Sequence, residues 1–296
     1  GPWERSIALE TSMMGRLCTA LLIGLGAAPL AAQQDTLQPP LRDRGPGVRT
    51  SEFQTYIQRG QLFVIPSASY VKDHNLEYSS LNEGSGIGQQ NDLTGSFHSG
   101  SAQLLLAYGV TEWLAFEVEA SYLDAHFDRS PQDTTGTQPI NESGLGDFAV
   151  QARMRFLRER GSRPEIWGSL EFIPAANQDK LLIGDAPSDL KGEIGFTRGY
   201  QFGTMTFKTT IEWNHVDQHW DLGETSIEYL RRLSTNWRLM AALEGGETGA
   251  PDEFVFVTSL QWRASRHAVV GLANSFGFME KSTDWEPQVG IRFELP

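Results

Sequence analysis

From Gln61 to the end of the chain, apolar and polar residues alternate in runs of about ten residues. In the run 204–214, Met205, Phe207, Ile211 and Trp213 alternate with polar side chains. This period of two is typical of a β-strand with one apolar and one polar face. Twelve runs share the pattern and are the predicted strands: 61–72, 97–109, 113–125, 144–157, 163–174, 190–202, 204–215, 223–232, 236–245, 253–263, 266–278 and 284–295.

The predicted connections alternate in length. The short ones lie at 109–112, 158–162, 203, 233–235 and 264–265. The long ones lie at 73–96, 126–143, 175–189, 216–222, 246–252 and 279–283. Bacterial membrane barrels sort their connections in this way, with short turns in the periplasm and long loops outside. We therefore predict an all-β fold, a twelve-stranded antiparallel transmembrane β-barrel over residues 61–296 with both termini periplasmic.

Alternation alone also fits a soluble β-sandwich, whose apolar face is a core rather than a lipid contact. The positions of the aromatic residues favour the membrane barrel, because amphipathic aromatics concentrate at the two interfaces of a bilayer. Twelve aromatic residues lie near predicted strand ends on the apolar face: Tyr108, Trp113, Tyr122, Phe156, Trp213, Tyr229, Trp237, Phe254, Trp262, Phe276, Trp285 and Phe293.

Composition read without order gives a different picture. A mean hydropathy of −0.33 and a net charge of −13 are typical of a soluble acidic protein. The order along the chain resolves this, because the mean combines a lipid-facing apolar set with a charged lumen and acidic loops. The negative charge argues against a nucleic-acid partner. The chain has one cysteine, Cys18, which excludes a disulfide framework.

The first sixty residues form two segments ahead of the barrel. Residues 13–32 combine Arg16, an apolar run and Ala31-Ala32, which predicts a secretory signal peptide cleaved after Ala32. Residues 1–12 look like a cloning remnant or an over-long start, so 1–32 are not part of the mature fold. Residues 33–60 are polar and rich in proline, and we expect an extended or disordered periplasmic lead-in that includes one short helical turn around 51–58. Export and a barrel together predict the outer membrane of a Gram-negative bacterium.

The polar face of the predicted strands is charged, with both signs present. Buried charges persist only if they are paired or solvated, so these residues either close the lumen by ion pairs or line an aqueous path. Eight-stranded barrels are filled and sixteen-stranded barrels are open, which leaves both possibilities for twelve strands. The predicted lumen-lining residues, and candidates for selectivity, are Glu117, Glu119, Arg153, Arg155, Glu171, Lys208, Glu212 and Arg238.

Several short motifs carry a family resemblance. Ser143-Gly144-Leu145-Gly146-Asp147 open the fourth predicted strand, and Gln58-Arg59-Gly60, 108–112 and 182–203 hold further glycine-rich matches. The chain resembles the outer-membrane transporter family named for the meta-pathway of phenol degradation over most of 58–296. It departs at Pro174-Ala175-Ala176, where that family commonly has Pro-Thr-Gly. The resemblance implies a barrel that takes up small, often aromatic, compounds.

Catalytic and metal chemistry is weakly represented. A barrel lipid hydrolase would need a serine and a histidine on one strand face; His98 has Ser96 two residues away, whereas Ser99 points to the other face. The six histidines show no metal-ligand spacing, and no motif predicts a cofactor. We therefore expect a non-enzymatic channel or transporter for a small solute, in contact with outer-membrane lipid and lipopolysaccharide. A closed structural or surface-binding barrel is the second hypothesis and a lipid hydrolase the third. Oligomeric state stays open.

Overall fold

In the computed structural model of the chain, the described residues are 43–78, 93–133, 138–175, 180–183, 188–214, 219–245, 254–278 and 283–295. The predicted signal peptide, 13–32, and the residues before it lie outside them. No helix in these ranges is long and apolar enough to cross a bilayer.

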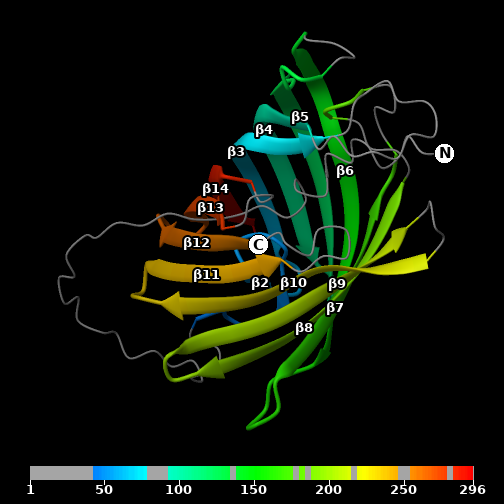
Figure 1. Ribbon diagram of the computed structural model, residues 1–296. Coiled ribbons are helices and arrows are strands. Elements are labelled where there is room, and N and C mark those ends of the chain that lie inside the picture. The colour runs from blue at the N-terminus through cyan, green and yellow to red at the C-terminus, as the bar shows by residue number, and fades with distance from the viewer. Residues whose placement is uncertain are drawn as a thin grey trace.

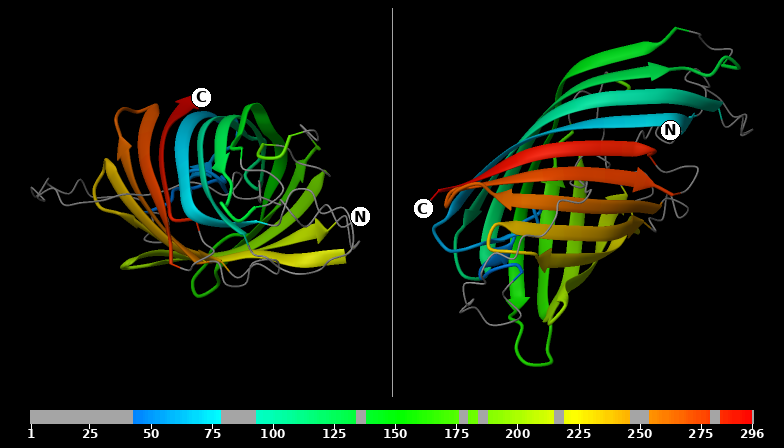
Figure 2. Two further views of the ribbon diagram at one scale, coloured as in Figure 1. Left: turned by 45° about the horizontal axis from the view of Figure 1, so that its top comes forward. Right: turned by 90° about the vertical axis from the view of Figure 1, so that its left-hand side faces the viewer.

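Twelve antiparallel strands form one closed barrel, in which sequence neighbours pair and the last strand, β14, pairs with the first, β3. Figure 2 shows the ring of strands from two further directions. The strands are β3 (Leu62–Tyr78), β4 (Leu93–Gly109), β5 (Leu114–Asp128), β6 (Ile140–Leu157), β7 (Glu165–Ile173), β8 (Asp189–Tyr200), β9 (Gly203–Asn214), β10 (His219–Arg232), β11 (Trp237–Gly245), β12 (Phe254–Arg263), β13 (Ala268–Gly277) and β14 (Trp285–Leu295). The predicted twelve-stranded antiparallel barrel is confirmed.

The strands differ from the predicted ones in two informative ways. The strands β3 to β6 are longer than expected, and Figure 1 shows them reaching beyond the rest of the barrel. The strand β10 begins at His219 rather than at 223, so the predicted long connection at 216–222 is much shorter. A β-bulge between Leu222 and Thr225 explains this, because it interrupts the alternation on which the prediction rested.

The middle of the barrel has an apolar outer face and a polar inner face. On β5, Phe116 and Tyr122 point outward and are 45% and 50% exposed, while Glu117 points inward and is 2% exposed. The predicted aromatic residues Trp113, Phe156, Trp262 and others share the outer face. This arrangement is the reverse of a soluble protein, whose apolar side chains are inside.

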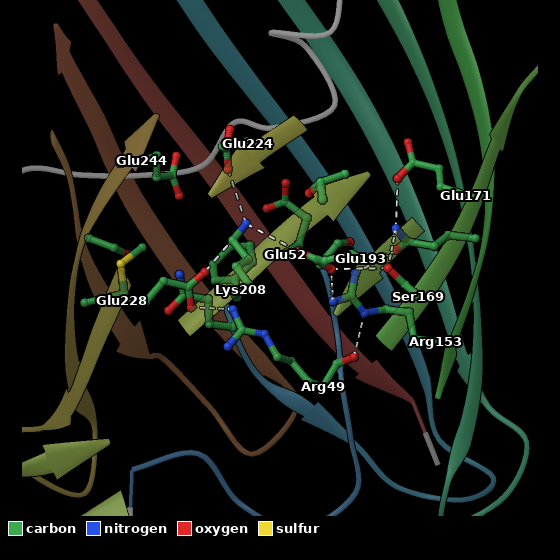
Figure 3. Close-up of a pocket in the computed structure, with 18 of the residues that line it drawn as sticks. Arg49, Glu52, Arg153, Ser169, Glu171, Glu193, Lys208, Glu224, Glu228 and Glu244 are labelled. Carbon is green, nitrogen blue, oxygen red and sulfur yellow. Dashed lines mark hydrogen bonds and ion pairs between the residues drawn. The ribbon is translucent and has the colours of Figure 1, made fainter. Parts of the chain in front are cut away.

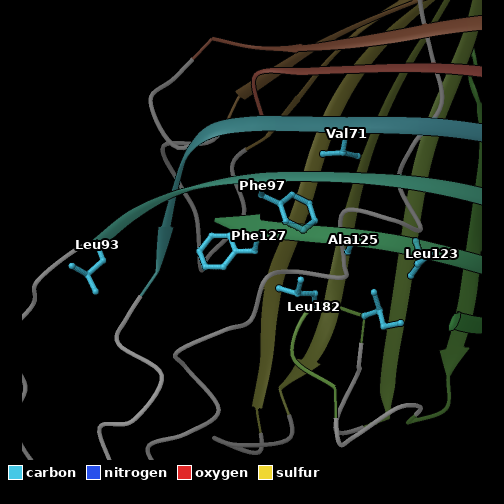
Figure 4. Packing of buried hydrophobic residues seen from close by; sticks show 8 residues of the cluster. Val71, Leu93, Phe97, Leu123, Ala125, Phe127 and Leu182 are labelled. Carbon is cyan, nitrogen blue, oxygen red and sulfur yellow. The ribbon is translucent and has the colours of Figure 1, made fainter. Parts of the chain in front are cut away.

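Beyond this band the extended parts of β3 to β5 have the opposite polarity. On β5, Asp124 and His126 point outward, whereas Leu123 and Phe127 point inward and are fully buried. The inward apolar residues form a compact cluster with two residues of the connection between β7 and β8, as Figure 4 shows. The cluster consists of Val71, Leu93, Phe97, Leu123, Ala125, Phe127, Leu182 and Ile183.

The described residues ahead of β3 lie inside the barrel. Residues 43–60, here named the plug, contain a small hairpin of two antiparallel strands of two residues each, β1 (Val48–Arg49) and β2 (Tyr56–Ile57). Gly47 precedes β1 with a φ of +117°, and a Cβ there would lie 2.1 Å from the carbonyl oxygen of Ile57. The expectation of an extended or disordered lead-in with a helical turn is corrected for 43–60, which are ordered and largely buried. Residues 33–42 lie outside the described residues.

Candidate functional site

The plug sits at the end of the barrel where the short turns lie. The backbone N–H of Gly60 donates to the carbonyl of Gly109 at the first short turn (2.7 Å). Arg44 forms an ion pair of 2.5 Å with Glu159 at the turn after β6. Asp43 accepts a hydrogen bond of 2.7 Å from the backbone of Arg232 at the end of β10. These contacts fix the plug across the width of the barrel.

Buried charges hold the middle of the plug. The Arg49 guanidinium forms an ion pair of 2.5 Å with Glu228 of β10, and both side chains are almost fully buried. Arg153 of β6 donates from Nε to the backbone carbonyl of Arg49 (2.9 Å). The guanidinium carbons of Arg49 and Arg153 lie 4.9 and 5.2 Å from the ring centre of Trp167. Cation–π contacts of this kind are strongest when they are desolvated, as they are here.

Glycine makes room for that tryptophan. Trp167 on β7 faces Gly195 on β8 across the strand pair. A Cβ at position 195 would lie 2.2 Å from the indole ring. The indole N–H donates to Thr197 (2.9 Å), so the ring is fully satisfied although it is only 2% exposed. The local sequence therefore encodes a buried aromatic platform for the arginine of the plug.

At the tip of the plug, glycines of the barrel wall again make room for an aromatic ring. Phe53 packs against Gly271 and Gly290, which are paired across β13 and β14. Phe53 and Gln54 both have positive φ angles, 56° and 46°, an unfavourable conformation for non-glycine residues. The carbonyl of Phe53 accepts a hydrogen bond of 3.0 Å from Gln261. The wall thus holds a strained turn in place.

One tyrosine of the plug is buried against a carboxylate. The Tyr56 hydroxyl donates to Glu165 (2.8 Å) and the side chain is 7% exposed. Burial, together with the nearby negative charge of Glu165, raises the pKa of Tyr56 well above its usual range. Tyr56 therefore remains a neutral hydrogen-bond donor under ordinary conditions.

Above the plug, the lumen contains a cavity that we name the cup. It holds about 1190 Å³ of empty space, counting the part open to solvent. Residues Arg49 and Ser51 to Gln54 of the plug form its floor, and its wall continues along the strands to Ile173 and Glu244 near the ends with long connections. Figure 3 shows the charged residues of floor and wall pointing toward one another. Those lining the cup are Arg49, Glu52, Arg153, Glu171, Lys191, Glu193, Lys208, Glu224, Glu228 and Glu244.

Lys208 is the centre of the network on one wall of the cup. Its ammonium lies 3.5 Å from Glu193, 3.6 Å from Glu224 and 3.7 Å from Glu228. Glu193 also pairs with Arg153 (3.1 Å). Since acidic side chains outnumber basic ones around the cup, it is a polar space with an excess of negative charge.

The eight residues predicted to line the lumen all lie on strands with their side chains inward, but they divide into two groups, five that belong to the wall of the lumen and three that bond to the plug. Arg153, Glu171 and Lys208 line the cup. Glu119 and Glu212 bond to neighbours on the wall, Gln103 and Lys191.

The remaining three hold the plug. Glu117 accepts a hydrogen bond of 2.5 Å from the Ser51 hydroxyl, and Arg155 donates to the carbonyl of Gly47. Arg238 donates to the carbonyl of Asp43 (3.2 Å). The sequence could not separate the two groups, because the plug carries no strand pattern that marks it as a lumen partner.

On the wall of the cup, sequence reasoning missed Glu224 and Glu244. In the plug it missed Arg44, Arg49, Ser51, Phe53 and Tyr56. The one signal of the plug residues was the mixture of charged and aromatic residues in 43–60, which is also common in linkers. The lipid hydrolase, the third hypothesis, would need a serine beside a histidine on one strand face. The ring of His98 lies 4.6 Å from that of His126 on the outer surface, and Ser99 points inward and is buried. Among the described residues no group of three or more His, Cys, Asp or Glu could hold a metal ion.

No family model and no curated protein matches the chain, so the resemblance described above stays a prediction. Several solved structures are similar to the chain at low identity. The translocator domain of the autotransporter NalP from Neisseria meningitidis is 10% identical, with a TM-score of 0.49, over 80% of this chain and 89% of that one. The P. putida toluene transporter TodX is 9% identical, with a TM-score of 0.37, over 80% and 89%.

A Pseudomonas aeruginosa FadL homologue is 8% identical, with a TM-score of 0.35, over 86% of this chain and 94% of that one. The fold assignment rests on the strand pairing of this chain rather than on these scores.

Proposed function

We propose that this chain is an outer-membrane β-barrel of a Gram-negative bacterium, exported through a cleaved signal peptide. The support is the outer surface, where residues such as Leu104, Phe116 and Trp262 are more than two-fifths exposed around the barrel. In water this would be an apolar surface far larger than soluble proteins carry, whereas in a bilayer it is the lipid face. The short turns and both termini are then periplasmic, and the long loops lie outside, in contact with lipopolysaccharide.

We infer that the barrel passes a small solute without chemistry and that the plug is its gate. One observation carries this proposal: the floor of the cup is made of the plug residues Arg49 and Ser51 to Gln54, not of side chains from the barrel strands. A floor of this kind can leave without breaking any strand pairing. The cup then becomes a continuous path to the periplasmic side. The resemblance implied small, often aromatic, solutes, and the charged cup favours those that also carry a polar or charged group.

The lumen charges have two roles in this proposal. Glu171 and Lys208 line the path and select the solute, while Arg153 lines the path and also bonds to the backbone of Arg49 in the plug. Glu117 and Arg155 bind the plug and set how often it opens. Substitution in the first group changes which solute passes, and substitution in the second changes how often any solute passes.

A reversible cross-link tests the gate. Since Cys18 is the one cysteine of the chain and lies in the predicted signal peptide, the exported protein offers a cysteine-free background. Ser51→Cys with Glu117→Cys places two thiols where the hydroxyl and carboxylate now touch. In proteoliposomes, joining them with a short reducible thiol linker should abolish solute flux, and reduction should restore it. The two single-cysteine variants are the controls, and a flux indifferent to the linker contradicts the gate.

A closed barrel that acts through its external loops is the second candidate, and one observation favours it. The connection between β7 and β8 is fixed on the barrel: the backbone N–H of Leu182 donates to Glu142 (2.7 Å), and Lys180 donates to the carbonyl of Ser143 (2.7 Å). An organised external surface of this kind suits binding. Failure of Arg49→Ala, which weakens the plug, to pass any solute would favour this candidate. A lipid hydrolase ranks third and requires lipid hydrolysis that His98→Ala abolishes.

A further inference from the structure

A group of polar side chains on the inner faces of β13 and β14 takes no part in the plug. Glu286 of β14 is 2% exposed, and Ser275 of β13, its direct cross-strand partner, is 3% exposed. Gln288 follows two residues later on the same face of β14, is 7% exposed and lines the cup. Side chains paired in this way have Cβ atoms about 5 Å apart, so the three polar groups are neighbours.

Each of these side chains has an oxygen without a partner. Glu286 Oε1, Ser275 Oγ and Gln288 Oε1 are buried and accept no hydrogen bond within the described part of the chain. Glu286 receives a hydrogen bond from Ser69 of β3, and no lysine or arginine of the described ranges pairs with it. The lumen carboxylates of Glu193 and Glu228, in contrast, are each within 4 Å of a cation.

Such an arrangement is costly unless a ligand completes it. A buried carboxylate without a counter-charge is destabilising, and each unpaired buried acceptor loses a hydrogen bond that water would have supplied. Three acceptors and one negative charge match a group with one positive charge and three N–H donors. A primary ammonium group has these properties. Hard divalent metal ions instead take six or more oxygen ligands, commonly from several carboxylates.

We propose that Glu286, Ser275 and Gln288 bind the primary ammonium group of a small organic cation beside the cup, whose wall Gln288 lines. This proposal names the chemical class of the solute. It rests on the proposed function in one respect, that the solute enters through the cup. Val71, the inward residue of β3 between the partners of Trp285 and Gln288, belongs to the apolar cluster. The carbon chain of the ligand therefore extends toward an apolar surface while its ammonium group faces the carboxylate.

Binding is measured on the full chain in detergent by isothermal titration calorimetry, without any transport step. The probe is n-butylammonium, compared with tetramethylammonium, which has the same charge and no N–H donor, and with K⁺. We expect n-butylammonium to bind and the other two to bind at least about tenfold more weakly. Glu286→Gln keeps the shape, removes the charge and should weaken n-butylammonium binding about tenfold or more. Ser275→Ala should cause a smaller loss.

The matched control is Asp189→Asn, which removes an inward carboxylate already paired with Lys191 (3.0 Å) and should leave binding unchanged. A heat-modifiable band on gels verifies that each variant is a folded barrel. Equal binding of n-butylammonium to the wild type and Glu286→Gln overturns the proposal, and so does equal binding of K⁺ or tetramethylammonium. A barrel that conducts without binding n-butylammonium overturns this assignment alone, whereas one that binds and never conducts overturns the gated channel alone.

Discussion

The plug can dock against the wall because residue 271 is a glycine, which leaves room for the Phe53 ring. A Cβ at that position would lie 2.2 Å from Phe53 Cε1, well inside ordinary van der Waals contact, so in Gly271→Ala the ring must move away from the wall. Overpacking of this kind costs about 1–3 kcal/mol. That cost acts on the docked plug and not on the undocked one, and it raises the undocked fraction about 5- to 150-fold.

Limited proteolysis measures that fraction without any assumption about transport. Arg49 is a trypsin site, and it is 6% exposed while the plug is docked. Cleavage after Arg49, followed by mass spectrometry, therefore reports the undocked population when undocking is fast relative to cleavage. We expect Gly271→Ala to be cut at Arg49 about 5- to 150-fold faster than the wild type, in the range given by the overpacking cost.

Two further variants make the expectation sharp. In Gly290→Ala the new Cβ would lie 3.1 Å from Phe53 Cζ, a contact that a small shift relieves, so its effect should be smaller. In a Phe53→Ala background the clash has no partner, and Gly271→Ala should add nothing further, as a double-mutant cycle would show. Unchanged cleavage in Gly271→Ala, or an equal acceleration in the Phe53→Ala background, would refute the assigned contact.

Three other predictions follow from contacts of the plug and the wall. Arg49→Ala leaves Glu228 with Lys208 as its remaining cation and should weaken docking of the plug by about 3–5 kcal/mol. The measurement is the rate of trypsin cleavage after Arg44. The control, Arg158→Ala, breaks an exposed pair with Glu112 and should change the docking free energy by less than about 1 kcal/mol. Gly195→Ala meets Trp167 at 2.2 Å and should lower barrel stability in denaturant by about 1–3 kcal/mol, whereas Gly100→Ala meets open space and should be neutral. Because the folded pKa of Tyr56 is raised above its unfolded value of about 10, docking stability is complete below about pH 10 and is lost as the pH rises further. Absorbance titration near 295 nm should show one late-ionising tyrosine that Tyr56→Phe removes.

The barrel was predictable from sequence because its two faces differ in polarity along every strand. Alternation such as Met205, Phe207 and Trp213 identifies a strand, and closure then places the other face in the lumen. The extensions of β3 to β6 were missed for a physical reason. At Tyr70-Val71 and Tyr122-Leu123 the apolar residues change from the outer to the inner face, so a search for one continuous apolar stripe ends there.

The plug was not predictable from the same pattern. Arg44, Arg49, Glu52 and Tyr56 are the residue types of a solvated linker, and in a soluble protein they would be one. Inside this barrel the plug is buried by charge pairing as well as by apolar packing, in which Val48, Phe53 and Ile57 contact an apolar part of the wall. Hydropathy carries no information about an ion pair such as Arg49–Glu228, whose partners are far apart in the sequence.

The plug has a further consequence for how the protein assembles. It comes first among the described segments, yet Glu117 of β5, Gln261 of β12 and the Gly271–Gly290 pair of β13 and β14 all contact it. These contacts span nearly the whole circumference, so they exist together only after the final strand has joined the first. A barrel with one hairpin too few or too many has a different diameter and cannot satisfy them. The plug therefore docks last, and it docks fully only in a barrel that has closed with the correct number of strands.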